Sequence, residues 1–240
     1  MAPQVLFIHN EHLATEALLG EAFTECGYDV ATFTVVPAER INDPVVDVAF
    51  PDPTAYDVIV PLGARWPVYD EALRQSWVGT EMQMLRDAAD AGVPTLGVCF
   101  GGQLLAQAFG GSVARSATPE IGWYDVASDD EGLIPGGKWF EWHFDTWTLP
   151  PGATEIARTT NASQAFMLGR ALGLQFHPEV DHDLLDGWLA DDPNGEVAGF
   201  GLSHDQLLSA TTVFEKDTAR RIRSLVRGFL SRVAIQPCPS

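Results

Sequence analysis

The stretch GVCFGGQLLAQAFGG, residues 97–111, changes from an apolar run to a helical pattern at a single cysteine. PTLGVCF, which ends at Phe100, is typical of a buried strand, and GQLLAQAFGG is typical of a short helix. Glycines at 97, 101 and 102 surround Cys99, as a sharp strand-to-helix turn requires because side chains would crowd the backbone there. The stretch therefore predicts a strand that enters a helix through a tight turn, with Cys99 at the turn.

Two interpretations of Cys99 fit this turn. A helix that starts at about Gly101 would stabilise a thiolate at its N-terminus, and the backbone N–H of Phe100 would point to where an oxyanion could form. Free cysteine is also among the most often buried residue types, so Cys99 could be a small core residue. The turn alone does not separate a nucleophile from a structural cysteine.

Strand and helix patterns alternate on the N-terminal side of this turn. Expected strands cover Val5–Asn10, Tyr28–Val36 and Ala55–Gly63, and expected helices cover Leu13–Gly27 and Trp77–Gly92. This alternation indicates βαβ units and a parallel sheet. Ligands of such sheets bind at the carboxyl ends of the strands, which is where Cys99 is expected to lie.

The pattern changes on the C-terminal side. Ser112–Ser128 and Trp139–Pro150 are rich in aromatic and β-branched residues and indicate added antiparallel strands. Arg170–Val180 predicts another buried strand, Ala190–His204 a loop, and Asp217–Ala234 a final helix. We expect an α/β fold with a single open, mostly parallel twisted sheet, helices on both faces and added antiparallel strands. One domain spanning 1–240, with its core at about 5–233, accounts for the chain.

Composition restricts the partners. The formal net charge is −19, which disfavours nucleic acid and anionic membranes because both are bound through clustered Lys and Arg. No apolar run is long enough to span a bilayer. The three cysteines, Cys26, Cys99 and Cys238, are widely spaced and suggest no disulfide framework, which fits a reducing cytoplasm.

The segment QFHPEV, ending at Val180, offers partners for a cysteine nucleophile. His177 and Glu179 lie two residues apart at the end of an expected strand, so their side chains point the same way. A carboxylate in this position can hold the imidazole in one tautomer while its other nitrogen faces the thiol. Cysteine, histidine and carboxylate at strand ends of one sheet favour the nucleophile interpretation.

A metal site is the competing interpretation of this region. Possible ligands are His177, Glu179, Asp181, His182 and Asp183, which His143 and Asp145 could join. Zinc sites combine histidine with carboxylate, but this spacing matches no metal-binding motif. We therefore expect no metal and no cofactor.

Four segments together resemble the class I glutamine amidotransferases, above all free-standing members related to the amidotransferase domain of GMP synthetase. They are GVCFGGQLLAQAFGG, EIGW at 120–123, WHFD at 142–145 and GLQFHPE at 173–179. The resemblance runs from about Val5 to Glu179 and includes the last helix. It implies a flavodoxin-like sheet and a Cys99–His177–Glu179 triad that cleaves a γ-glutamyl amide through a cysteine thioester.

The resemblance also implies a substrate site. An oxyanion hole would use backbone N–H groups of Phe100 and of the loop at Gly63 and Ala64. Substrate contacts would come from Gln103, Phe144 and Asp145. The sequence departs from the family at Ala64, which replaces a second loop glycine, and at Arg65, which replaces a proline and offers a partner for a substrate carboxylate. Gly102 and Phe144 also depart, at places where relatives often carry His and Gly, and these changes put the identity of the substrate in doubt.

Three functions remain open. The protein could release ammonia from glutamine for a separate synthase subunit, since no P-loop is found in these 240 residues. It could act alone as a hydrolase of γ-glutamyl amines or peptides. It could also be a non-catalytic subunit that binds a partner, although an intact triad argues against this.

Overall fold

Five short apolar segments form the parallel half of a nine-stranded sheet. The computed structural model describes residues 2–192, 195–235 and 238. The sheet has the order β2-β1-β3-β4-β9-β8-β7-β5-β6, and its first five strands are parallel neighbours. These are β2 (Asp29–Val36), β1 (Gln4–Glu11), β3 (Val58–Pro61), β4 (Thr95–Val98) and β9 (Ala171–Leu174). Three of them, β3, β4 and β9, are buried along their whole length, as strands covered on both faces must be.

The other four strands continue the sheet in antiparallel pairs. They are β8 (Ser163–Leu168), β7 (Thr154–Arg158), β5 (Ser112–Ser128) and β6 (Gly137–Thr148). The expected strands at 112–128 and 139–150 are therefore confirmed as β5 and β6, whereas β7 and β8 were not anticipated. The result is the mixed sheet with parallel and antiparallel parts that the sequence predicted.

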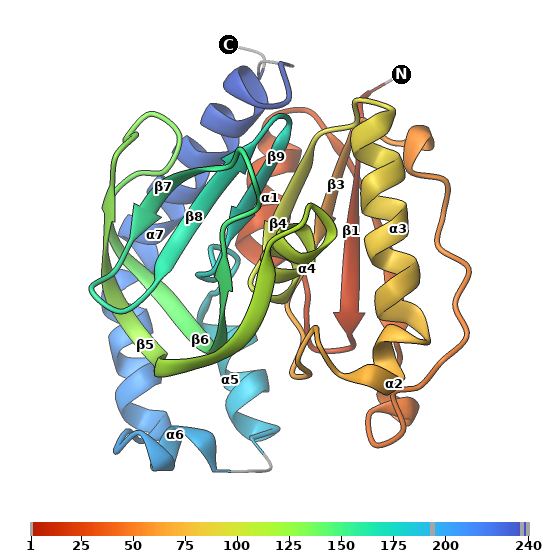
Figure 1. Ribbon diagram of the computed structural model, residues 1–240. Helices are drawn as coiled ribbons and strands as arrows, with labels where there is room; N and C mark the ends of the chain where they lie inside the picture. Colours follow the sequence, from red (N-terminus) through yellow and green to blue (C-terminus); the bar gives the residue numbers. More distant parts are fainter. Residues whose placement is uncertain (1, 193–194, 236–237, 239–240) are drawn as a thin grey trace.

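Helices cover both faces of the sheet. Figure 1 shows α3 (Trp77–Asp90) and α4 (Phe100–Ala108) in front of it, and α1 (Ala17–Glu25) and α7 (His204–Arg232) behind it. Shorter helices are α2 (Glu71–Arg74), α5 (His182–Ala190) and α6 (Glu196–Gly199), with 3₁₀ turns at η1 (Ala38–Arg40) and η2 (Pro53–Ala55). No helix in the described part of the chain is both long and apolar enough to cross a bilayer.

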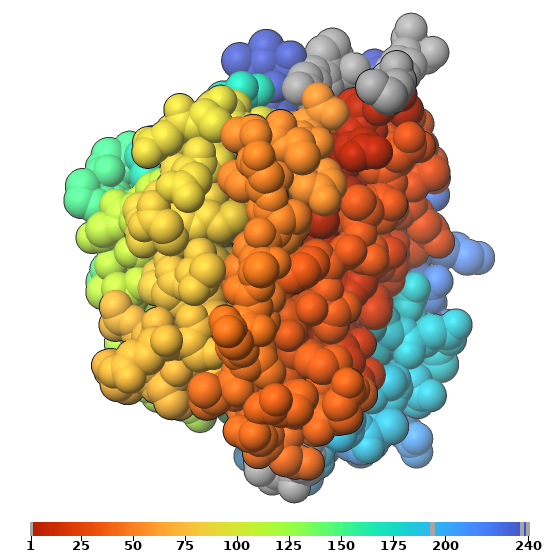
Figure 2. Space-filling model, turned by 90° about the vertical axis from the view of Figure 1, so that its right-hand side faces the viewer, coloured from red at the N-terminus to blue at the C-terminus, as the bar shows by residue number. Residues whose placement is uncertain are grey.

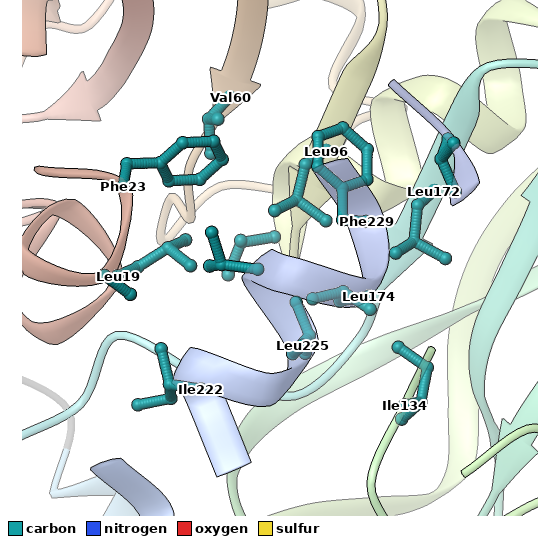
Figure 3. Close-up of a cluster of buried hydrophobic side chains, with 14 of the residues drawn as sticks. Leu19, Phe23, Val60, Leu96, Ile134, Leu172, Leu174, Ile222, Leu225 and Phe229 are labelled. Atoms are coloured by element: carbon teal, nitrogen blue, oxygen red, sulfur yellow. The ribbon is translucent and has the colours of Figure 1, made fainter. Parts of the chain in front are cut away.

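Each face of the parallel strands has its own core. On one side, Leu19 and Phe23 of α1 meet Leu225 and Phe229 of α7 over the strands (Figure 3). On the other side, Trp77 of α3 packs against Phe100 of α4, with ring centroids 5.7 Å apart. The segment 37–57, in orange tones in Figure 2, covers the side of the molecule next to β2, and several of its apolar residues pack on this second core. The two layers fix β4 and α4 from both sides.

Three expectations need correction. The strand expected at 170–180 ends at Leu174, because the chain bends at Gln175 and Phe176, and His177 then pairs with Phe140 of β6. The last helix starts at His204 rather than Asp217, since a capping box between Ser203 and Gln206 begins it early. The expected loop at 190–204 contains α6, and its residues 193–194 lie outside the described residues.

The cysteines also need a correction. Cys26 at the end of α1 forms a disulfide with Cys238, while Cys99 is free and buried. The two bonded residues are 212 positions apart, so their spacing gives no sign of the pairing. Cys238 packs on the same core cluster as α1 and α7, which contact each other.

Candidate active site

Cys99 lies at the sharp turn between β4 and α4. Its backbone has φ +51° and ψ −107°, a region that a side chain other than glycine rarely adopts. The residue is only 6% exposed, yet its side chain reaches the main cavity. A cysteine in a strained conformation at the start of a helix is the backbone arrangement that the sequence predicted for this position.

The glycines around Cys99 are required by close packing. A Cβ at Gly101 would collide with the carbonyl of Pro61 in β3, and one at Gly97 would lie 2.5 Å from the Gly101 carbonyl. A Cβ at Gly102 would lie 2.5 Å from the carbonyl oxygen of Leu174 in β9. The turn is therefore pressed between the two neighbouring strands, which fixes the direction in which Cys99 points.

His177 and Glu179 follow β9 and form a buried pair. Nδ1 of His177 donates to Oε1 of Glu179 over 2.7 Å, which leaves Nε2 to face the cavity. The backbone N–H of His177 donates to the carbonyl of Phe140 over 2.8 Å and ties the segment to β6. Two hydrogen bonds thus hold His177, one from its imidazole ring and one from its backbone N–H.

The charge environment favours a protonated imidazole. Burial by itself lowers the pKa of His177, but the carboxylate of Glu179 and the thiol of Cys99 outweigh burial and raise this pKa well above its usual value. The pKa of His177 therefore depends on both Glu179 and Cys99, which places the imidazole between the carboxylate that it binds and the sulfur.

Further contacts enclose the sulfur and the imidazole. Sγ of Cys99 lies 3.9 Å from the carbonyl oxygen of Trp142 and 3.7 Å from Nε2 of Gln175. The ring of Trp188 packs edge-on against His177, with centroids 4.9 Å apart. A Cβ at Gly63 would lie 3.2 Å from Cε1 of His177, so the absence of a side chain there keeps the imidazole in place.

A cavity of about 380 Å³ opens beside Cys99 and His177. Its size is within the range of small-molecule sites. All four residues expected to contact substrate line it, as do both loop residues of the expected oxyanion hole: Gln103, Phe144, Asp145 and Arg65, and Gly63 and Ala64. Glu179 does not line the cavity and lies behind the imidazole. Trp66 and Trp142 form parts of the wall.

The loop that carries Gly63 and Ala64 is held by a carboxylate. Glu11 at the end of β1 accepts from the backbone N–H of Arg65 over 3.0 Å and from its Nε over 2.6 Å. Burial raises the pKa of Glu11, although the Arg65 guanidinium opposes the rise. Arg65 also donates to Asp191 over 2.7 Å, so two carboxylates already bind its guanidinium.

The other substrate candidates form one connected wall. The side-chain amide of Gln103 lies 3.4 Å from the carbonyl oxygen of Asp145. The Asp145 carboxylate accepts from the Tyr69 hydroxyl over 3.1 Å, and Arg115 lies 4.0 Å from it. The Arg115 guanidinium also sits 4.4 Å from the centre of the Phe144 ring. This wall offers amide, carboxylate and guanidinium groups to a zwitterionic ligand.

The metal ligands suggested for residues 177–183 do not assemble into one site among the described residues. His177 and Glu179 bind each other, and Asp181 caps α5 by accepting from Leu184 N over 2.7 Å. His182 is about half exposed and Asp183 fully so. His143 instead contacts Glu120 and Glu141.

Several cavity residues were not anticipated from the sequence. Glu11, Tyr69, Arg115, Trp188 and Asp191 come from four separate segments and line the cavity together. Gln175 belongs to the quoted segment GLQFHPE, but nothing in a single sequence marks it as a neighbour of Cys99. Only the folded sheet brings these side chains to one place.

Comparisons with known proteins agree on one family. The profile described as "Glutamine amidotransferase class-I" matches residues 15–191. The chain is 41% identical over 112 residues to a glutamine-hydrolysing GMP synthase of Aeropyrum pernix and 37% identical over 116 residues to one subunit of such a synthase from Sulfurisphaera tokodaii. These alignments cover 41% and 43% of this chain, and 22% and 62% of the two relatives. The chain thus spans about a fifth of one relative and under two thirds of the other.

Solved structures agree over nearly the whole chain. A glutamine amidotransferase from Thermotoga maritima superposes with a TM-score of 0.82 at 26% identity, covering 96% of this chain and 99% of the other. One from Methylobacillus flagellatus gives a TM-score of 0.81 at 22% identity, covering 96% and 95% of the two chains. The second likeness shows a shared fold.

Proposed function

This chain belongs to the class I glutamine amidotransferase family, and from that premise we propose that it hydrolyses the amide of glutamine or of a related γ-glutamyl compound with a Cys99–His177–Glu179 triad. The observation that carries the proposal is the buried hydrogen-bonded pair of His177 and Glu179 beside a cysteine at a strained turn. The family match and the cavity next to these residues support it.

The first half of the reaction forms a thioester. The Cys99 sulfur attacks the amide carbon while His177 holds the thiol proton, and the carbonyl oxygen becomes an oxyanion. The amide of Phe100, in the first turn of α4, has no acceptor within its helix and is free to stabilise that charge together with the loop at Gly63 and Ala64. The C–N bond then breaks, and His177 gives its proton to the departing nitrogen.

The second half returns the enzyme to its starting state. Water attacks the thioester carbon and gives a proton to His177, the C–S bond breaks, and the glutamyl group leaves as a carboxylic acid. Glu179 keeps Nδ1 of the imidazole occupied throughout, so that Nε2 alone exchanges protons with sulfur, nitrogen and water. Gln103, Phe144, Asp145 and Arg65 would hold the amino-acid end of the substrate.

The fate of the nitrogen allows two versions of this function. In the first, ammonia passes to a separate synthase subunit, which fits the likeness to a protein named as one subunit of a GMP synthase. In the second, the protein acts alone on γ-glutamyl amines or peptides. The second version is supported by the extension of the cavity past His177 to Trp188, Asp191 and Glu196, where a larger leaving group could lie.

One assay separates these functions from a non-catalytic role. We expect glutamate to be released from glutamine or from a panel of γ-glutamyl amides, and Cys99→Ala to reduce turnover by at least about 10³-fold. Circular dichroism and urea unfolding of Cys99→Ala serve as the folding control. Wild-type protein that releases no glutamate from any of these compounds would contradict the proposal, as would a Cys99→Ala variant with undiminished turnover. In the first of these cases, a non-catalytic partner subunit would be the remaining function.

A further inference from the structure

Next to the cavity, strands β5 and β6 bring three buried ionisable side chains together. Glu120 of β5 lies directly opposite His143 of β6 in the register of the two strands. Glu141 precedes His143 by two residues, so both side chains point to the same face. Glu120 and Glu141 are 0% exposed and His143 is 2% exposed. None of the three has a role in the proposed triad.

The histidine presents one nitrogen to two carboxylates. Nε2 of His143 lies 3.0 Å from Oε2 of Glu120 and 3.6 Å from Oε2 of Glu141. Its Nδ1 lies 3.0 Å from the carbonyl oxygen of Asp145, which can only accept, so Nδ1 carries a hydrogen. In the neutral ring Nε2 is then a bare lone pair facing two oxygens, and this arrangement requires a positive species between them.

Neighbouring groups form hydrogen bonds with Glu120 and His143, whereas Glu141 has no such bond to a described residue. Glu120 accepts from Nδ2 of Asn161 over 3.0 Å and from Nε2 of Gln164 over 2.7 Å. Within the part of the chain that the structure describes, neither carboxylate oxygen of Glu141 has a hydrogen-bond partner, and neither has Oε1 of Gln164. An unpartnered carboxylate in the interior is costly unless a proton or a cation neutralises it. Glu141 is aimed at the same point as the lone pair of His143.

We propose that Glu120, Glu141 and His143 bind a divalent transition-metal ion of the zinc class. Their ligand atoms lie within 4.8 Å of one another, and one imidazole with two carboxylates is a donor set that zinc accepts. The hydrogen bond from Nδ1 to a backbone carbonyl is the outer contact that metal-binding histidines usually make, and Asn161 and Gln164 orient Glu120 in the same way. An imidazole ligand disfavours magnesium and calcium.

The site is connected to the cavity and to the triad. His143 is among the residues that line the cavity, so the cluster lies directly beside it. The strand that carries Glu141 and His143 also binds the triad through its backbone, since Phe140 accepts from His177 and Trp142 lies beside the Cys99 sulfur. A bound ion would therefore stiffen the part of β6 that positions His177 and Cys99. This inference does not depend on the proposed hydrolysis.

A proton is the competitor of the metal ion. In the absence of an ion, a proton is the species that can neutralise the buried Glu141 carboxylate beside Nε2 of His143. Ligands must be deprotonated to bind a metal, so binding releases protons, and we expect affinity for the ion to weaken as pH falls.

The test measures bound metal directly. Purified full-length protein is dialysed against chelator, loaded with Zn²⁺ or Co²⁺, desalted, and analysed for metal content and for the visible absorption of Co²⁺. About one ion per chain is expected in the wild type, with ligand-field bands of nitrogen and oxygen donors, and an excess of Mg²⁺ should not displace it. In Glu141→Gln the affinity should fall roughly tenfold or more.

Glu81→Gln is the matched control. Glu81 in α3 is another fully buried carboxyl, and burial raises its pKa to about 8, but it belongs to no group of metal ligands among the described residues. It should keep the wild-type metal content. Wild-type protein that retains no ion, or a loss that is equal in both variants, would overturn the proposal and leave a shared proton as the neutralising species. If Glu141→Gln does not fold, absence of the Co²⁺ bands in the wild type decides the question.

Discussion

At the residue scale, the negative charge of Glu179 raises the pKa of His177, the imidazole at the centre of the proposed reaction. Glu179 does not line the cavity, yet it fixes Nδ1 of His177 and contributes to its raised pKa. A raised pKa in the folded state means that the imidazolium stabilises the protein fully below the unfolded value of about 6.5, and that this contribution is lost as pH rises through the folded value. Activity and stability should therefore change over the same range of pH.

Glu179→Gln tests this coupling. Because the negative charge is removed, the pKa of His177 should fall, and the alkaline limb of the kcat/KM profile should move to lower pH. Turnover should fall by roughly 10²- to 10⁴-fold. The measurement is the pH dependence of glutamate release.

Glu16→Gln is a matched control for this change. It removes a similar carboxylate, which binds Nε2 of His9 over 2.7 Å outside the main cavity. It should leave the profile unchanged. An unshifted alkaline limb in Glu179→Gln would show that the carboxylate does not tune the imidazole.

At the residue scale, sequence reasoning was strongest where chemistry and backbone shape coincide. Cys99, flanked by glycines, could be placed at a turn because no other arrangement explains so many small residues there. His177 and Glu179 could be paired because they are two residues apart. Trp188 and Glu141 could not be identified, since their importance depends on contacts with segments distant in the sequence.

At the scale of elements, the turn from β4 to α4 depends on the absence of side chains. Gly101→Ala should destabilise the protein by about 1–3 kcal/mol because its Cβ would collide with the Pro61 carbonyl. Gly187→Ala in α5 is the control, since no described residue lies within 4 Å of the Cβ that it adds, and it should raise the free energy of unfolding by up to about 1 kcal/mol. Urea unfolding measures both. Equal stability of the two variants would show that the turn tolerates a side chain.

Some helices and strands could not be predicted from the sequence. The strands β7 and β8 and the helix α5 were not anticipated, and they lie in the part of the chain where the βαβ alternation has ended. Their order in the sheet, with β8 beside β9 and β7 beside β5, follows from long-range pairing. Local patterns of apolar residues contain no information on such pairing.

At the scale of the whole molecule, the disulfide joins the end of α1 to Cys238, which follows α7 in the chain. Cys26 and Cys238 close a loop of almost the entire chain, which restricts the unfolded state. Cys238→Ser should lower the free energy of unfolding by about 2–4 kcal/mol while turnover at saturating substrate stays unchanged, because neither cysteine lines the cavity. Urea unfolding without reductant, with thiol titration of the denatured wild type, measures this. Three free thiols in unreduced wild type would contradict the pairing.

The measurement that tests the central claim most directly is the intact mass of the enzyme during turnover. Wild-type protein is mixed with glutamine, or with the γ-glutamyl amide that it cleaves fastest, and quenched in acid within the first turnovers. We predict a fraction of the protein heavier by one γ-glutamyl group, with the added mass on the peptide that contains Cys99 and absent from Cys99→Ala. Rapid glutamate release with no such adduct at any quench time, or an adduct on another residue, would contradict the account.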